Sequence, residues 1–168
     1  MAKATTIKDA LTKWEERTKE DSTKALDIGL QFQWPPIEKM DGTLNTLLEC
    51  RKLSLSSNMI EKITGIDIQF FQEPLADTLE ELWVSYNAIE KIKPIEAMKA
   101  LKVFYISNNS IKDWAEFNRM GAAPRLEEIS FIGNPLYESM EESNFRSEAI
   151  RRLPNLKKLD GEPVIRGD

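Results

Sequence analysis

The stretch Leu79–Ile92 reads LEELWVSYNAIEKI, and two secondary structures compete for it. LEEL has the i, i+3 apolar spacing of a helix, whereas LWVSY alternates as a strand does. A strand would turn Leu82 and Val84 toward one face and Trp83, which lies between them, toward the other. The local pattern does not decide between the two structures, so the decision depends on the rest of the chain.

The frame of this stretch recurs three more times. Counted from the first residue of each copy, apolar side chains stand at positions 1, 4, 6 and 11, and an asparagine stands at position 9. The other copies are CRKLSLSSNMIEKI from Cys50, LKVFYISNNSIKDW from Leu101 and LEEISFIGNPLYES from Leu126. This pattern is the signature of leucine-rich repeats, which bury their apolar faces only by stacking. It predicts a short strand in each copy, so LEEL is predicted not to be helical.

A fainter copy, DIGLQFQWPPIEKM, starts at Asp27 and has Pro35 where the asparagine belongs. We interpret it as a terminal repeat. The spacing between copies leaves room only for a turn and a short helix, except across the irregular segment at 64–78, for which the sequence offers no account. In this alignment the core positions of the first copy are taken by Leu30, Phe32, Ile37 and Met40.

The copies together predict an α/β leucine-rich-repeat solenoid, with a parallel sheet on one face, short helices on the other and helical caps at both ends. At 168 residues the chain has the length of one domain. We divide this domain, 1–168, into an N-terminal cap at 1–26, about five repeats at 27–140 and a C-terminal cap at 141–168.

Both caps have sequence signals of their own. A helix with one apolar stripe is predicted to follow Thr5 or Thr6 as N-cap. A second helix is predicted around Phe145–Leu153, ended by Pro154 and followed by a half-repeat. The apolar stripe of the first helix consists of Ile7, Ala10, Leu11 and Trp14, and the half-repeat has Leu156 and Leu159 at positions 1 and 4.

The four asparagines at position 9 are interpreted as structural. They stand where the chain turns out of each strand, and a buried amide there can satisfy loop backbone groups that have no partner in the sheet. The four residues are Asn58, Asn87, Asn109 and Asn134.

Composition excludes several classes of function. The chain has 23 Lys and Arg against 28 Asp and Glu, a net charge of −5, which disfavours nucleic acid as a partner. No apolar run approaches the ~20 residues of a membrane span, and the N-terminal residues lack the apolar stretch of a secretory signal. A single cysteine, Cys50, favours a reducing, intracellular compartment.

Residues for catalysis are missing from the sequence. It contains no histidine, the commonest general base and metal ligand, and no Gly-rich phosphate loop. Cys50 takes position 1 of its repeat, where a small buried hydrophobe is expected, and paired acids such as Glu127 with Glu128 are expected to be solvated surface. We therefore expect no enzyme activity, no cofactor and no metal site.

The outer row of the sheet, at positions 3, 5 and 7, is the expected functional surface. It places Trp83 and Tyr105 on neighbouring strands, with polar residues around them. Such an aromatic cluster has the composition of a protein-binding hot spot. The alternative is that the N-terminal segment or the 64–78 segment folds over it. The candidate binding residues are Trp83, Tyr105, Val103, Ile132, Glu81, Glu128 and Lys52, and the first strand is expected to contribute Gly29, Gln31 and Gln33 to the same row.

Several segments also resemble a known family. MAKATTIKDALTKWEERT, PPIEKM, LSLSSNMIEKI, DTLEELWVSYNAIEKI, ISNNSIKDWAEF, GNPLYE and RLPNLKKLDGEPVI closely resemble the leucine-rich-repeat light chains of axonemal outer-arm dynein, which belong to the SDS22-like subclass. The resemblance spans nearly the whole chain. It is interrupted at 64–78, where family members have another full repeat.

The resemblance implies a non-catalytic subunit of a motor in the cytoplasm, on the cytoskeleton of the ciliary or flagellar axoneme. It implies binding to the microtubule-binding stalk domain of the gamma-type dynein heavy chain, with tubulin as a further partner, as a monomer within the motor complex. Neither nucleic acid nor membrane is an expected partner. Carried over to this sequence, Trp83 and Tyr105 lie on the face that would bind the heavy chain. An SDS22-like phosphatase-regulatory subunit or another intracellular adaptor would share the fold but present a different outer row.

Overall fold

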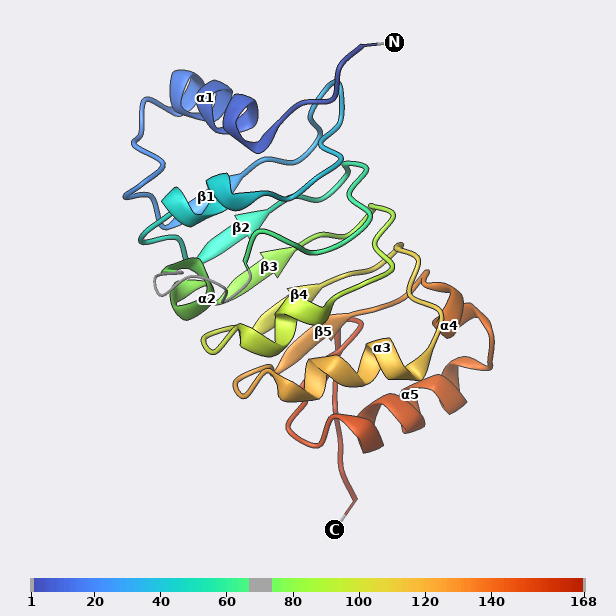
Figure 1. The fold of residues 1–168 in the computed structure, drawn as a ribbon. Helices are drawn as coiled ribbons and strands as arrows, with labels where there is room; N and C mark the ends of the chain where they lie inside the picture. Colours follow the sequence, from blue (N-terminus) through green and yellow to red (C-terminus); the bar gives the residue numbers. More distant parts are fainter. Residues whose placement is uncertain (1, 67–73, 168) are drawn as a thin grey trace.

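A computed structural model describes residues 2–66 and 74–167 of the chain. Its strands form one sheet in sequence order from β1 to β7, and the elements stack along one axis from the N-terminal to the C-terminal end (Figure 1). Neighbours from β1 to β6 pair in parallel, and β7 pairs antiparallel with β6. The strands are β1 (Asp27–Gly29), β2 (Lys52–Ser54), β3 (Glu81–Trp83), β4 (Val103–Tyr105), β5 (Glu128–Ser130), β6 (Lys158–Leu159) and β7 (Glu162–Pro163).

The stretch Leu79–Ile92 contains strand β3, so the helical spacing of LEEL reflects the repeat frame and not a helix. Leu82 and Val84 are fully buried, and Trp83 between them is half-buried on the opposite face. In register, Leu82 pairs with Leu53 on one side and Phe104 on the other. Side chains at one position of successive repeats therefore stack into a continuous core.

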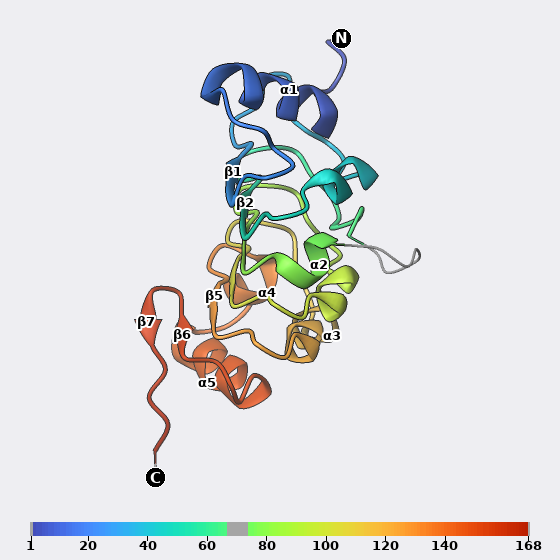
Figure 2. The same ribbon diagram turned by 90° about the vertical axis from the view of Figure 1, so that its left-hand side faces the viewer.

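Short helices form the layer on the other side of this core, as predicted. Figure 2 shows them on one side of the molecule and the strands on the other. Within the described ranges, none of the helices combines the length and apolarity that a membrane crossing requires. The layer consists of the 3-10 helices η1 (Gly42–Thr46), η2 (Lys93–Ala97) and η3 (Arg119–Ala122) and the α-helices α2 (Pro74–Thr78) and α3 (Trp114–Asn118). Helix α4 (Pro135–Glu138) follows the turn after β5 and packs against the C-terminal cap.

The N-terminal cap is helix α1 (Ile7–Thr18), which covers the open end of the stack (Figure 1). Thr6 is its N-cap. The Thr6 hydroxyl accepts a hydrogen bond from the Asp9 backbone N–H at 3.0 Å, and the Asp9 side chain accepts one from the Thr6 backbone N–H, which makes a capping box. The predicted stripe is confirmed, since its four members are the buried residues of this helix.

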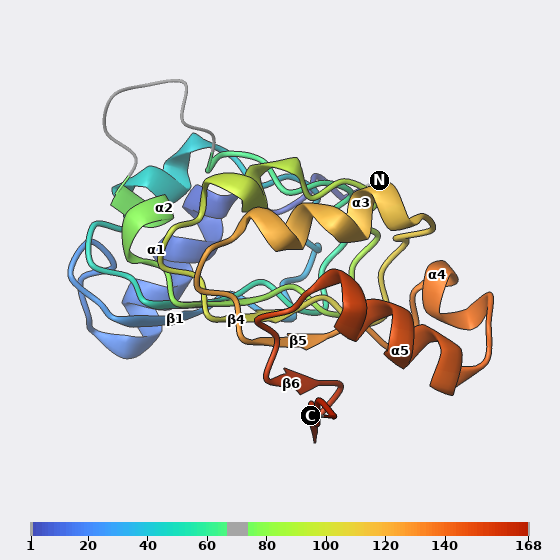
Figure 3. The same ribbon diagram turned by 90° about the horizontal axis from the view of Figure 1, so that it is seen from below.

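The C-terminal cap is helix α5 (Glu142–Arg152) together with β6 and β7. The Phe145 ring stacks on Phe131 with centroids 5.4 Å apart and meets Phe117 edge-on at 5.9 Å, which seals the end of the core. Leu159 pairs with Ile129 in register, as the predicted half-repeat requires. Figure 3, seen from below, shows α5 and β6 at this end.

The prediction for the first repeat was wrong in its strand. Ile28, and not Leu30, pairs with Leu53, so Leu30 takes position 6 and Phe32 is 78% exposed. Ile37 does hold position 11, because its backbone N–H donates to the Asn58 amide oxygen as the same position does in later repeats. Between Leu30 at position 6 and Ile37 at position 11 the chain is two residues longer than in the other repeats, which shifted the alignment. The outward residues of this repeat are therefore Asp27, Gly29 and Gln31, and Gln33 is not among them.

The irregular segment at 64–78 is described at its two ends, and residues 67–73 lie outside the described residues. Ile66 and Leu75 are buried, and α2 packs against η1 in the helical layer (Figure 2). Neither α1 nor these described ends lie over β3 and β4.

Candidate partner-binding site

The exposed face of the sheet has an aromatic pair at its centre. Trp83 on β3 and Tyr105 on β4 are direct partners in the parallel register. Their ring centroids lie 5.2 Å apart with an interplanar angle of 31°, and both side chains are half-buried. The strand period points both rings away from the core, which is filled by Leu82 and Phe104. The pair thus forms an aromatic surface that is partly exposed to solvent.

A cation covers one side of this pair. The Lys52 ammonium on β2 lies 4.0 Å from the centroid of the Trp83 ring, within the range of a cation–π interaction. The same ammonium lies 3.9 Å from the carboxylate of Asp27, its register partner on β1. The Trp83 ring on one side and the Asp27 carboxylate on the other therefore fix the position of the Lys52 ammonium.

On the other side of the aromatic pair, a carboxylate contacts Tyr105. The Tyr105 hydroxyl donates a hydrogen bond of 2.6 Å to Glu128 on β5, and the Lys158 ammonium on β6 lies 3.3 Å from the same carboxylate oxygen. Burial, the Glu128 hydrogen bond and the negative charges of Glu128 and Glu81 raise the pKa of Tyr105 to about 12. The phenol is thus neutral at physiological pH and fixed in orientation.

The remaining predicted site residues differ in how closely they join the pair. Val103 lies between Glu81 and Glu128 in register, two residues before Tyr105 on the same face of β4. It extends the apolar surface between two acidic side chains. Ile132 is 46% exposed but lies beyond the end of β5, so it flanks the site only by position.

Two residues near this site, Asp27 and Lys158, were missed by sequence reasoning. Asp27 was hidden by the shifted frame of the first repeat, and Lys158 was assigned to the cap. Ser54 is the register partner of Trp83 and is buried, although it lies in the outward row. The LKKL and LEEI segments contain a signal for Lys158, because they place Lys158 and Glu128 at the same repeat position with opposite charges.

The four asparagines of position 9 have the hydrogen bonds expected of a structural ladder. In the repeat that starts at Leu101, the Asn109 amide oxygen accepts a hydrogen bond from the Ile89 backbone N–H at 2.9 Å. Its amide nitrogen donates to the backbone carbonyls of Val84 and Ile106 at 3.0 and 3.1 Å. Each such amide therefore joins its own repeat to the preceding one. Equivalent bonds are made by Asn58, Asn87 and Asn134.

The chemistry of Cys50 matches a core position. The side chain is fully buried, its thiol donates to the Lys52 carbonyl at 3.2 Å, and burial raises its pKa to about 12. Over residues 2–66 and 74–167, no group of three or more Cys, Asp or Glu side chains is arranged to hold a metal ion.

The fold is that of a leucine-rich-repeat protein with an aromatic pair on the outward face of its sheet. The family described as Leucine Rich repeats (2 copies) matches residues 77–119. Among solved structures, the Drosophila melanogaster SNF/U2A′ complex contains a chain of similar fold, with a TM-score of 0.67 at 21% identity over 83% of this chain and 75% of that one.

Curated relatives give a narrower assignment. Dynein axonemal light chain 1 of Xenopus laevis is 52% identical over 99% of this chain and 95% of its own length. The human protein of the same name is 51% identical over 100% and 97%, and that of Chlamydomonas reinhardtii is 46% identical over 98% and 93%. The chain belongs to the dynein axonemal light chain 1 family.

Proposed function

We propose that this chain is a non-catalytic light chain of ciliary outer-arm dynein. In this proposal the sheet face around Trp83 and Tyr105 binds the microtubule-binding stalk domain of the gamma-type heavy chain. Bound there, the chain modulates how the motor engages microtubules and hence ciliary beating. Membership of the family implies a cytoskeletal location in the axoneme of a cilium or flagellum.

The observation that carries the proposal is the aromatic pair itself. The fold requires inward residues such as Leu82 and Phe104, whereas nothing in the repeat frame requires Trp83 or Tyr105. Aromatic side chains supply large contact area at little entropic cost, and clusters of them dominate binding energies. Lys52 contacts the Trp83 ring and Glu128 accepts the Tyr105 hydrogen bond, so both rings are already fixed in orientation and the surface is preorganised for a partner.

A physical route to modulation follows from charge. The chain has a net charge of −5. An acidic protein held beside a microtubule-binding domain would repel an acidic filament surface and weaken or redirect the approach of the motor. Raising the salt concentration should therefore shrink the difference in microtubule affinity between heavy chain with and without this protein. A difference that does not change with salt would contradict this route and leave steric effects as the cause.

The binding surface can be tested by capture of heavy chain from axonemal extract. Wild type should capture the gamma-type heavy chain, and Trp83→Ala should lose most of that capture. Tyr86→Ala is the matched control, because Tyr86 is an aromatic residue of the same repeat that is 61% exposed and follows the strand. Equal capture by wild type and Trp83→Ala would contradict the proposed surface, and recovery of a phosphatase subunit instead would favour the adaptor alternative.

A further inference from the structure

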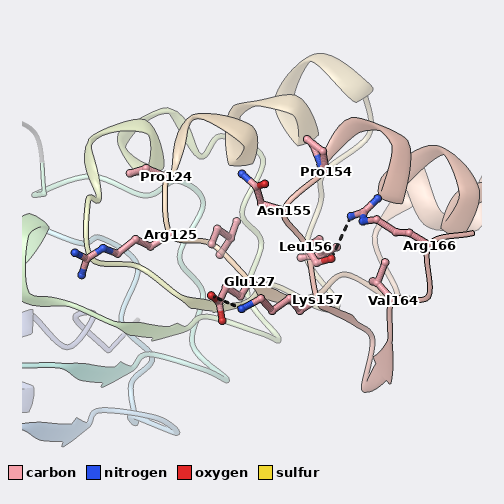
Figure 4. Close-up of a pocket in the computed structure, with 10 residues that line it drawn as sticks. Pro124, Arg125, Glu127, Pro154, Asn155, Leu156, Lys157, Val164 and Arg166 are labelled. Carbon is pink, nitrogen blue, oxygen red and sulfur yellow. Dashed lines mark hydrogen bonds and ion pairs between the residues drawn. The ribbon is translucent and has the colours of Figure 1, made fainter. Parts of the chain in front are cut away.

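A hollow lies at the C-terminal end of the stack, where two loops lead into neighbouring strands. Its volume is about 610 Å³, within the range of ligand pockets. One wall is the loop Pro124–Glu127 before β5, and the other is the loop Pro154–Lys157 before β6 (Figure 4). Val164 and Arg166, from the segment after β7, close it at one side.

The two loops have the same construction. Each follows a helix, begins with a proline and buries a leucine two residues later, in APRLEE and LPNLKK. Leu126 and Leu156 are 5% and 3% exposed, so they form an apolar floor. The Lys157 ammonium lies 2.9 Å from the Glu127 carboxylate and links the two walls (Figure 4).

The side chains that line the pocket have a net positive charge, opposite in sign to the net charge of the whole chain. Three cationic side chains, Arg125, Lys157 and Arg166, line it against the single carboxylate of Glu127, in a chain whose net charge is −5. Lys157 has three N–H donors and uses one on Glu127. Arg125 is exposed, and its guanidinium has no hydrogen bond or ion pair with any other residue that the structure describes.

Arg166 has a structural part in the same pocket. Its guanidinium donates to the carbonyls of Ile150, Leu153 and Leu156 at 3.0, 2.8 and 3.1 Å, which fixes the segment after β7 against the end of α5. Three of its five N–H donors are used in this way, so its part in the pocket is mainly structural. The side chains with most of their donors free are Arg125, Lys157 and the Asn155 amide.

We propose that this pocket binds an acidic peptide segment, with carboxylates on Arg125 and Lys157 and aliphatic stems on the proline rings. Figure 4 shows Arg125 and Arg166 at opposite ends of the pocket with Lys157 between them, so the donors are spread along a line and not focused on one point. An extended chain with several carboxylates fits that arrangement, whereas one small anion would contact one end. Nucleic acid fits poorly, because no aromatic side chain lines the pocket for base stacking and Glu127 would repel phosphates.

The test uses the full chain and a fluorescein-labelled hexaglutamate peptide, with hexaglutamine as the neutral peptide. Wild type should bind hexaglutamate and not hexaglutamine, and added salt should weaken the binding. Arg125→Gln should weaken it about tenfold, as expected for loss of a charge-assisted contact. Asn155→Asp, which adds a carboxylate to the pocket, should weaken it as well.

The matched control is Arg17→Gln, which makes the same charge change at an exposed residue of α1 at the other end of the stack. Binding by this variant should equal that of wild type, and so should binding by Trp83→Ala, because the aromatic face is a separate surface. The proposal is wrong if hexaglutamate does not bind, if Arg17→Gln weakens it as much as Arg125→Gln does, or if inorganic phosphate at equal charge displaces the peptide.

Discussion

Trp83 and Tyr105 occupy the same position of two consecutive repeats, and their rings meet on the exposed face of the sheet at 5.2 Å between centroids. Lys52 lies over the indole, and Glu128 accepts the phenol's hydrogen bond. Four consecutive strands, β2 to β5, thus each contribute one side chain to a single surface. Such an arrangement depends on parallel register, because a slip of one residue would send each side chain to the core.

The contact between Tyr105 and Glu128 predicts an alkaline titration. The Tyr105 pKa is raised to about 12 by burial and by Glu128, so its phenol should ionise well above the ordinary tyrosine pKa of 10.0. Glu128→Gln removes a negative charge and should move that pKa downward. Tyrosinate absorbance measured against pH, with Tyr105→Phe used to assign the transition, checks this. An unchanged titration in Glu128→Gln would contradict the role given to this carboxylate.

The same shift predicts how stability depends on pH. The folded state favours the neutral phenol, so the contribution of Tyr105 to stability is fully present below the ordinary tyrosine pKa of 10.0, which holds in the unfolded chain, and is lost as pH rises toward about 12. The free energy of unfolding of wild type should therefore fall over this interval more steeply than that of Tyr105→Phe. The free energy of unfolding is measured by urea titration at each pH. If it falls equally with pH in wild type and in Tyr105→Phe, the prediction is contradicted.

The asparagine ladder predicts a stability loss when one amide is removed. Asn109→Ala leaves the Ile89 N–H without its partner in a buried site and removes one of the two amide donors of the Val84 carbonyl, which should cost about 1–3 kcal/mol. The urea midpoint should fall accordingly. Asn144→Ala, at an exposed position of α5, is the control and should change it little. An unchanged midpoint in Asn109→Ala would contradict the structural role.

Gly133 has a left-handed backbone conformation. Its φ is +81°, and a β-carbon there would lie 2.7 Å from Cγ of Asn108, closer than atoms pack. Gly133→Ala should therefore cost about 1–2 kcal/mol for the left-handed backbone, and the Asn108 side chain would have to move aside. Gly121→Ala is the control, because the nearest atom to its added carbon, on Leu153, is 3.6 Å away. Equal melting temperatures for both variants would refute the argument.

Cys50 should resist thiol reagents until the protein unfolds. Its side chain is fully buried and its pKa is raised to about 12, so the reactive thiolate is scarce and shielded at neutral pH. Labelling by a disulfide reagent should be slow in buffer and fast in denaturant. Asn144→Cys supplies an exposed thiol that should react at once in the native state. Rapid labelling of Cys50 in buffer would show that this part of the core opens readily.

Much of the fold is predictable because the repeat frame is redundant. Leu53, Leu82, Phe104 and Ile129 occupy one position of the frame and pair in one register, so each copy supports the reading of the others. The N-terminal stripe is equally clear, since its spacing and the Thr6 cap agree.

The first repeat shows where such reasoning fails. Ile37 keeps its place in the frame, but the longer loop before it lets Phe32 take a core position in the alignment and not in the molecule. Asp27 was displaced with it, so the partner of Lys52 was not found. The C-terminal pocket was also beyond the sequence, because it depends on Arg166 folding back onto the end of α5. Neither the outward position of Asp27 nor the C-terminal pocket has a local sequence pattern that identifies it.

The central claim is that the aromatic face binds the heavy chain. Its most direct test is the affinity of the purified microtubule-binding domain of the gamma-type heavy chain for wild type and for Trp83→Ala, measured by calorimetry. A buried aromatic hot spot contributes about 2 kcal/mol or more, so the account predicts a loss of roughly thirtyfold or greater, with Tyr86→Ala unchanged. Equal affinity of wild type and Trp83→Ala, with both proteins folded, would contradict it.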